Sequence, residues 1–229
     1  PGVSLAFELE PLGLVFAGLI AVLGVLSAPY ASGYLRATED RQPARLLAFL
    51  ALATGAGMAV ALSANLFTFF IFYEALTLAA FPLVTHTTDP ESRRAGRLYL
   101  WTLLGASMAL LLPAVIWTYA LAGKLDFVKG GLLAGSLDPI TGNILLVLFV
   151  FGLAKAALMP MHRWLPASMT APHPVCGLLH GVVVVKAGAF GVMKVVIYIF
   201  GDGFGYAAQA AFGILVISVV TMILASLLA

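Results

Sequence analysis

Long apolar stretches are the feature that most limits how this chain can fold. A helix needs about 20 mostly apolar residues to cross the hydrocarbon core of a bilayer. The sequence offers seven such stretches, at approximately 11–32, 46–64, 65–85, 97–122, 140–159, 174–200 and 205–229. Of its 229 residues, 62% are hydrophobic and only 10% are charged, whereas soluble domains are roughly 45–50% apolar. The sequence therefore predicts an integral membrane protein.

Each stretch is expected to be a helix, because an open strand edge in lipid would leave backbone groups without partners. Only residues 63–65 separate the second stretch from the third. This spacing predicts a tight helical hairpin, with one bent element as the alternative. The longest polar connection, residues 123–142, is short and rich in glycine. We therefore expect residues 1–229 to form a single all-α membrane domain of about seven helices.

Charged residues in the connecting segments predict the orientation of the chain. The connections after the first, third and fifth stretches are rich in arginine, whereas the opposite connections offer only Lys124 and Lys129. The arginines are Arg36, Arg41, Arg45, Arg93, Arg94, Arg97 and Arg163. Positively charged loops favour the cytoplasmic side, so we expect these loops to be cytoplasmic and residue 1 to face outward. The expected location is a bacterial plasma (inner) membrane.

Several classes of function are disfavoured by the composition. A formal net charge of +2 without a basic stripe argues against nucleic-acid binding. Cys176 is the only cysteine, so neither an internal disulfide nor a cysteine-based metal site is expected. The sequence also lacks a glycine-rich phosphate loop and a paired-histidine haem motif. We therefore expect no cofactor, no metal and no redox chemistry on this chain. The opening PGVSLAFELE shows no signal peptide and suggests a piece of a longer protein.

Glu74 is the acidic residue that stands out. It lies near the middle of the third stretch, where an isolated carboxylate costs several kcal/mol. The remaining acidic residues lie in termini or connecting segments: Glu8, Glu10, Glu39, Asp40, Asp89, Glu91, Asp126, Asp138 and Asp202. We expect Glu74 to face protein or water, and to be either protonated or paired with a cation.

Three lysines within apolar stretches are candidate partners for Glu74. Lys155 lies about fifteen residues into its stretch and Lys186 about twelve residues into its own, so both are expected to be buried in the bundle. Lys194 lies within two turns of the end of its stretch, and its side chain is expected to reach the interface. Burial disfavours a charged ammonium group, whereas a nearby carboxylate favours it. Our hypothesis is that Glu74 and Lys155 form a switchable pair; a static ion pair joining two helices is the alternative.

Histidines extend this set along the sixth stretch. His180 titrates near neutral pH when unperturbed, and it precedes Lys186 by six residues. His173 lies seven residues before His180, on nearly the same helical face. Each histidine alone is more often a hydrogen-bonded core residue. Together with Glu74, Lys155 and Lys186, however, His180 supplies the groups that a proton relay requires.

Proline accompanies charge at two positions. Pro160 cannot donate a backbone hydrogen bond to the carbonyl of Ala156, which is adjacent to Lys155. We therefore expect the helix to kink or break there, and broken helices in transporters commonly mark the ion site. Pro82, two turns after Glu74, likewise cannot donate to the carbonyl of Leu78 and could mark a second break near a charged residue. A plain kink is the alternative.

Three segments carry a resemblance to a known family. They are YEALTLAAFPLV (73–84), GLAKAALMPMHRWLPASM (152–169) and PHPVCGLLHGVVVVKAG (172–188), in that order. They resemble the proton-conducting antiporter-like subunits of respiratory complex I and the large subunits of Mrp cation/proton antiporters. The chain departs from the family where Ala167 replaces the aspartate of a common WLPDA motif. Any role of that aspartate is therefore in doubt.

The resemblance implies a fold and a mechanism. It implies a bundle with two inverted five-helix repeats, of which this chain would cover helices three to nine and hence the first repeat with flanking helices. The chain would be a fragment or one part of a split subunit. By motif position, Glu74 matches the family's buried glutamate and Lys155 its broken-helix lysine. His180 and Lys186 match polar positions of the next helix. The chain could then belong to a proton-translocating NADH:quinone oxidoreductase-type enzyme.

We therefore expect a membrane subunit that moves H⁺, alone or in exchange for Na⁺, through Glu74, Lys155, His180 and Lys186. His173, Lys194 and Pro160 are possible accessory residues. The expected partners are lipid and other membrane subunits of a larger complex. Two alternatives remain open. One is a structural subunit without its own ion pathway, and the other is a secondary transporter of a small solute that binds at the broken helix.

Overall fold

The computed structural model describes residues 4–87, 89–135 and 137–228, without the side chains of Leu179, His180 and Leu228. These residues form helices and isolated bridges but no named strand, which confirms the predicted all-α class. The α-helices are α1 (Pro11–Ala37), α2 (Pro43–Ala61), α3 (Leu66–Val84), α4 (Pro90–Ala106), α5 (Leu112–Ala122), α6 (Pro139–Gly152), α7 (Trp164–Ala167), α8 (His173–Cys176), α9 (Val184–Lys194) and α10 (Ala208–Leu228).

Shorter turns of π- or 3₁₀-helix, labelled η, connect or extend these helices. The π-helical turns are η1 (Ser107–Leu111), η5 (Gly177–Val182) and η6 (Val195–Phe200). The 3₁₀ turns are η2 (Ala154–Ala156), η3 (Met161–Arg163), η4 (Ser168–Thr170) and η7 (Gly201–Ala207). Pro113 follows η1 and has no N–H to offer the carbonyl of Ala109 within that turn. The lost donor accounts for the departure from α-helical pairing at this point.

The helix starts follow from local sequence. Proline occupies the first turn of α1, α2, α4 and α6, where its missing N–H costs nothing and its fixed φ angle suits a helix. Side-chain caps complete several starts. Asn65 accepts a hydrogen bond from the Thr68 N–H at 2.7 Å, and Asp89 accepts one from the Ser92 N–H at 2.8 Å. Gly123 ends α5 in the left-handed conformation, with φ of 69°.

By length and composition, five helical spans of the described chain can cross a membrane. They are Pro11–Ala37, Pro43–Ala61, Leu66–Val84, Pro90–Ala122 and Phe204–Leu227. The fourth combines α4, η1 and α5 without interruption. The other two predicted stretches are less regular: α6 is a shorter apolar helix, and residues 173–200 divide into α8, η5, α9 and η6.

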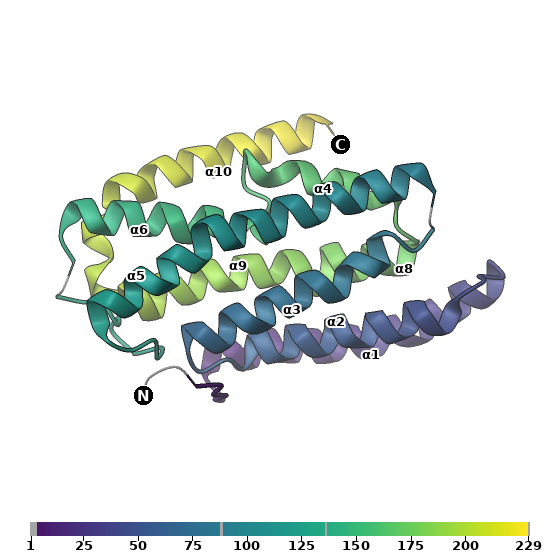
Figure 1. Ribbon diagram of the computed structural model, residues 1–229, viewed down its shortest axis with the longest axis horizontal. Helices are drawn as coiled ribbons and strands as arrows, with labels where there is room; N and C mark the ends of the chain where they lie inside the picture. The colour runs from purple at the N-terminus through teal and green to yellow at the C-terminus, as the bar shows by residue number, and fades with distance from the viewer. Residues whose placement is uncertain (1–3, 88, 136, 229) are drawn as a thin grey trace.

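The helices run side by side along the long axis of the molecule (Figure 1). The α2 and α3 helices pack as the predicted hairpin. The α9 helix lies inside the bundle, where it contacts α2, α3 and η2. Its buried aromatic neighbours include Phe16, which stacks on Phe190 with ring centroids 4.6 Å apart. This arrangement brings residues 152–157 against the middle of α9.

Six of the seven arginines lie in or beside the connection between α1 and α2 and the start of α4. These two segments are at the same end of the bundle, whereas Lys124 and Lys129 lie in the connection that joins the other ends of α5 and α6 (Figure 1). This distribution agrees with the alternation expected from the sequence. Which end faces the cytoplasm remains a prediction, and residue 1 lies outside the described residues.

Candidate functional site

The predicted break in the fifth stretch carries Lys155. The α6 helix ends at Gly152, and Lys155 lies on the single 3₁₀ turn η2 that follows. Ala157 then adopts the left-handed conformation, with φ of 56°, and the Met159–Pro160 peptide bond is cis. The break is therefore present, but it begins before Pro160. Our expectation that the helix continues to residue 159 was wrong, because the close packing at Gly152 and the turn at Ala157 already redirect the chain.

Two glycines make room for this break. A Cβ added at Gly152 would lie 2.5 Å from the backbone nitrogen of Leu111, and one added at Gly188 would lie 2.5 Å from the carbonyl carbon of Lys155. Both distances are too short for any side chain. The end of α6 therefore packs directly on η1, and α9 packs directly on the backbone of the break.

Trp164 satisfies part of the backbone that the break exposes. Its indole Nε1 donates a hydrogen bond to the carbonyl oxygen of Ala154 at 3.1 Å, and Ala157 N–H donates to the same oxygen at 3.0 Å. Trp164 is fully buried, and its ring meets the Tyr99 ring edge to face at 5.6 Å. Nonhelical backbone inside a membrane protein needs such partners. The tryptophan therefore fixes the chain immediately before Lys155.

The Lys155 side chain is fully buried and points at α3. Its Nζ donates a hydrogen bond to the backbone carbonyl of Tyr73 at 2.8 Å and lies 3.1 Å from the centroid of the Tyr73 ring. Its backbone N–H also donates to the Tyr73 hydroxyl at 3.3 Å. Our sequence analysis did not select Tyr73, although it immediately precedes Glu74. An aromatic face and a carbonyl oxygen both favour an ammonium group.

Glu74 is buried, as predicted, with an exposed fraction of 7%. Within the described chain its two carboxylate oxygens have no hydrogen-bond partner, and the ion pairs found there do not include it. Lys155 nevertheless acts on the carboxylate electrostatically. The hydroxyl of Ser107 lies beside Glu74 but donates its hydrogen bond to the Leu104 carbonyl at 3.0 Å. Glu74 and Lys155 are therefore neighbours without direct contact.

The other two predicted relay residues, His180 and Lys186, lie on the segment formed by η5 and α9. His180 lies on η5, and its side chain is outside the described part of the structure. Lys186 lies on α9 with its side chain exposed, so our expectation that it is buried within these helices was wrong. The buried face of α9 contains Ala187, Gly188 and Gly191, and Lys186 falls outside that face. His173 and Pro160 are not among the buried residues.

Lys194 is buried rather than extended to the interface, so the expectation for this residue was also wrong. Its side chain is 1% exposed and forms an ion pair with Glu10. Its Nζ also donates to the carbonyl oxygen of Ser63 at 2.5 Å and lies 4.2 Å from the centroid of the Phe127 ring. No local pattern in the sequence indicates this pair, because Glu10 and Lys194 are far apart in the chain.

The segment before α1 brings Glu10 to this position. Glu8 N–H donates to the Leu62 carbonyl at 2.9 Å, and Ala64 N–H donates to the Ala6 carbonyl at 3.0 Å. The first described residues therefore lie against the turn between α2 and α3, which carries Ser63. This cluster of Glu10, Ser63 and Lys194 occupies the end of the bundle opposite the arginines.

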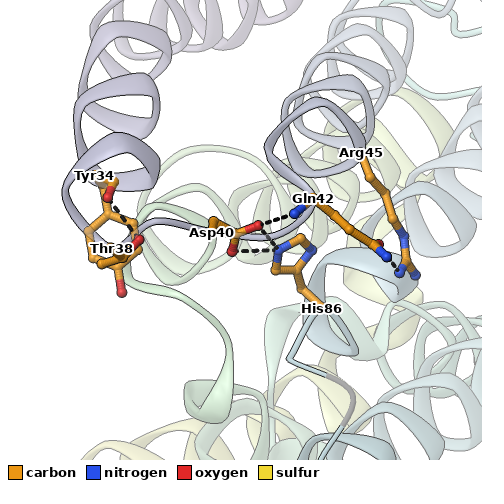
Figure 2. Close-up of polar contacts among 6 residues, drawn as sticks. All are labelled: Tyr34, Thr38, Asp40, Gln42, Arg45 and His86. Carbon is orange, nitrogen blue, oxygen red and sulfur yellow. Dashed lines mark hydrogen bonds and ion pairs between the residues drawn. The ribbon is translucent and has the colours of Figure 1, made fainter.

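A further ionisable pair joins two connections at the arginine-rich end. His86, after α3, points at Asp40 in the connection between α1 and α2 (Figure 2). Its Nε2 lies 3.0 Å from one carboxylate oxygen and 3.2 Å from the other. Burial alone would raise the pKa of Asp40, but hydrogen bonds from the Gln42 N–H and from His86 outweigh it, and the pKa lies below its usual value. The pair lies away from Glu74, at the bundle end.

Comparison with known proteins gives consistent matches. A model of the family described as NADH:quinone oxidoreductase/Mrp antiporter, TM, matches residues 63–229. The A/B subunit of a probable K⁺/H⁺ antiporter from Rhizobium meliloti (strain 1021) is 32% identical over 191 residues, which are 82% of this chain and 19% of that protein. Hydrogenase-4 component B of Escherichia coli (strain K12) is 32% identical over 193 residues, 84% of this chain and 28% of that protein.

Solved structures share the fold. The Mrp complex from Dietzia sp. DQ12-45-1b contains a chain that aligns with a TM-score of 0.74 and 24% identity, over 89% of this chain and 24% of that one. The membrane-bound sulfane sulfur reductase, an archaeal respiratory membrane complex, aligns with a TM-score of 0.67 and 25% identity, over 85% of this chain and 40% of that one. The chain thus spans less than half the length of each of these proteins.

Proposed function

This chain belongs to the NADH:quinone oxidoreductase/Mrp antiporter membrane family, and from that premise we propose that it moves protons through a site built on Glu74 and Lys155. The protein would work as part of a larger polypeptide in a multi-subunit membrane complex and exchange H⁺ for a monovalent cation. The names of its relatives, which include the Mrp complex and a probable K⁺/H⁺ antiporter, support this reading.

One observation carries the proposal: a fully buried lysine on a helix break, close to a buried glutamate but not bound to it. The Lys155 ammonium contacts only the carbonyl and ring of Tyr73 among the contacts found for it, and both are uncharged. A carboxylate that moves toward the ammonium favours the charged lysine, and one that moves away favours loss of the proton. A small movement of the break relative to α3 would therefore load or release a proton.

The remaining steps extend this exchange. A proton released by Lys155 would pass to His180 and Lys186 on the segment formed by η5 and α9. Lys186 is exposed on these helices, and a charged group within a membrane protein normally faces protein or water. We propose that further helices of the longer protein cover this face. The driving movement would come from a neighbouring protein of the complex, and the arginine-rich end would face the cytoplasm.

Substitution of Lys155 in the full-length protein, within its complex, tests the proposal. Everted membrane vesicles containing a pH-sensitive dye report H⁺ movement when Na⁺ or K⁺ is added. Lys155→Ala and Lys155→Arg should both reduce transport to the level of vesicles without the protein. Arginine keeps the positive charge but does not release its proton, so the second variant separates proton exchange from a static charge.

Lys129→Ala is the matched control, because Lys129 is exposed in a connecting segment. This variant should transport normally. Assembly of the complex is checked by copurification of its subunits. Normal transport by assembled Lys155→Ala protein would contradict the proposal and support a structural subunit. Normal transport by Lys155→Arg alone would favour a fixed positive charge at this position over proton exchange.

A further inference from the structure

Tyr99 is a buried titratable residue at this site that the proposed relay does not use. It lies on α4 with an exposed fraction of 0%, and its hydroxyl has no hydrogen-bond partner among the described residues. Leaving a buried hydroxyl unpaired is unfavourable, because the group loses its hydrogen bonds to water on folding. Buried polar groups in native proteins are therefore nearly always paired with protein or with ordered water. The Tyr99 hydroxyl needs a partner in its immediate surroundings.

Glu74 has the matching need. Both of its carboxylate oxygens are buried and unpartnered in the described structure, and its charge acts on Tyr99. Glu74 and Tyr99 come from α3 and α4, which pack together. The Ser107 hydroxyl lies beside Glu74 and also within hydrogen-bond distance of the Leu104 carbonyl, so its one proton cannot serve both acceptors at once. The tyrosine hydroxyl is a further donor for the carboxylate oxygens.

The tyrosine is also connected to the helix break. Its ring packs edge to face on Trp164, with centroids 5.6 Å apart. Trp164 in turn donates its indole hydrogen bond to Ala154, at 3.1 Å, immediately before Lys155. A movement of the break would therefore be transmitted to the Tyr99 ring. The contact between the Tyr99 and Trp164 rings therefore links Tyr99 to the turn that carries Lys155.

We propose that Tyr99 is a positioning residue for Glu74, and that its hydroxyl donates a hydrogen bond to the carboxylate through one bridging water. This bond stabilises the ionised carboxylate when Lys155 moves away. The groups that face Glu74 are then Lys155 from η2, Tyr73 from α3, Ser107 from η1 and Tyr99 from α4. The inference rests on the proposed function, because it requires Glu74 to change its protonation during transport.

Tyr99→Phe in the full-length protein tests this role, because it removes only the hydroxyl and keeps the ring on Trp164. Without the donor, Glu74 holds its proton more tightly. The pH at which transport is half-maximal should therefore shift upward by about one unit, which corresponds to a tenfold change in proton affinity. Tyr119→Phe is the matched control, since Tyr119 lies on α5 of the same span and is 37% exposed. It should leave the pH profile unchanged.

A spectroscopic measurement covers the case in which Tyr99→Phe does not transport. Infrared difference spectra of the purified complex between acid and alkaline pH contain the C=O band of a protonated carboxyl group, which Glu74→Gln assigns by removing it. The band should move in frequency in Tyr99→Phe and stay unchanged in Tyr119→Phe. A Tyr99→Phe protein with the wild-type band would overturn the inference, as would a wild-type pH profile. If Glu74→Gln transports normally, the proposed function itself fails.

Discussion

Removing either member of the buried Glu10–Lys194 pair should destabilise the protein, and by unequal amounts. The side chain of Lys194 is 1% exposed and that of Glu10 is 13% exposed. Glu10→Ala leaves the ammonium in the interior beside the oxygens of Ser63 and the rings of Phe127 and Phe190. Loss of one partner from a buried pair costs about 3–5 kcal/mol. Lys194→Met leaves a carboxylate whose side chain is less deeply buried than the ammonium, so we expect a smaller cost, about 1–3 kcal/mol.

The double variant decides whether this reasoning holds. Replacing a buried ion pair by apolar side chains is often neutral, so Glu10→Ala with Lys194→Met should be more stable than Glu10→Ala alone. Thermal midpoints of the full-length protein in one detergent give the order of stability. Glu91→Ala is the control, because Glu91 is exposed at the start of α4 and is not among the charges that act on Lys194. If the double variant loses as much as the two single variants combined, the groups do not interact and the reasoning is refuted.

Two further predictions follow from local geometry. Gly188→Ala places a methyl group against the backbone of Lys155, which should cost about 1–3 kcal/mol of stability and lower transport. Gly177→Ala is the control, because its Cβ would have open space around it, and it should change neither stability nor transport. Equal thermal midpoints and equal transport for the two variants would contradict this prediction. Because the folded pKa of Asp40 lies below the unfolded value of about 3.9, its stabilisation is present above about pH 4 and is lost as pH falls through the folded pKa. Thermal midpoints measured against pH should fall less at acid pH in Asp40→Asn than in the wild-type protein. An equal fall in both proteins would show that Asp40 and its contact with His86 do not cause the loss of stability.

Most membrane spans, and the presence of a helix break near Lys155, were predictable from the sequence. Apolar length indicated most of the spans, and Pro160, five residues after Lys155, indicated a break but not where it begins. The contact of Lys155 with Tyr73 was not predictable. It arises because α6 ends at Gly152, where close packing on Leu111 turns the chain toward α3. A helix end set by contact with another helix has no signature in its own segment.

Errors at Lys186 and Lys194 have a related cause. Depth within an apolar stretch predicted burial for Lys186, but the face of a helix that is buried depends on which neighbours pack against it. Lys194 was assigned to the interface from its distance to the end of the stretch. Its actual partner, Glu10, is held by the segment before α1, whose position depends on hydrogen bonds to Leu62 and Ala64. Pairings between distant parts of a chain require the fold.

The two buried lysines differ in a way that bears on which of them can exchange a proton. Lys194 is at the end of α9 and touches the Glu10 carboxylate, so losing its proton would leave that carboxylate without its cation. Within the described part of the chain, the Lys155 ammonium contacts the uncharged carbonyl and ring of Tyr73, and its backbone is on a single 3₁₀ turn outside any long helix. A turn of that kind can shift without unwinding a helix. Under the proposed function, a movement of this turn relative to α3 would change the distance from the Lys155 ammonium to Glu74, and the charge on Lys155 would follow that distance.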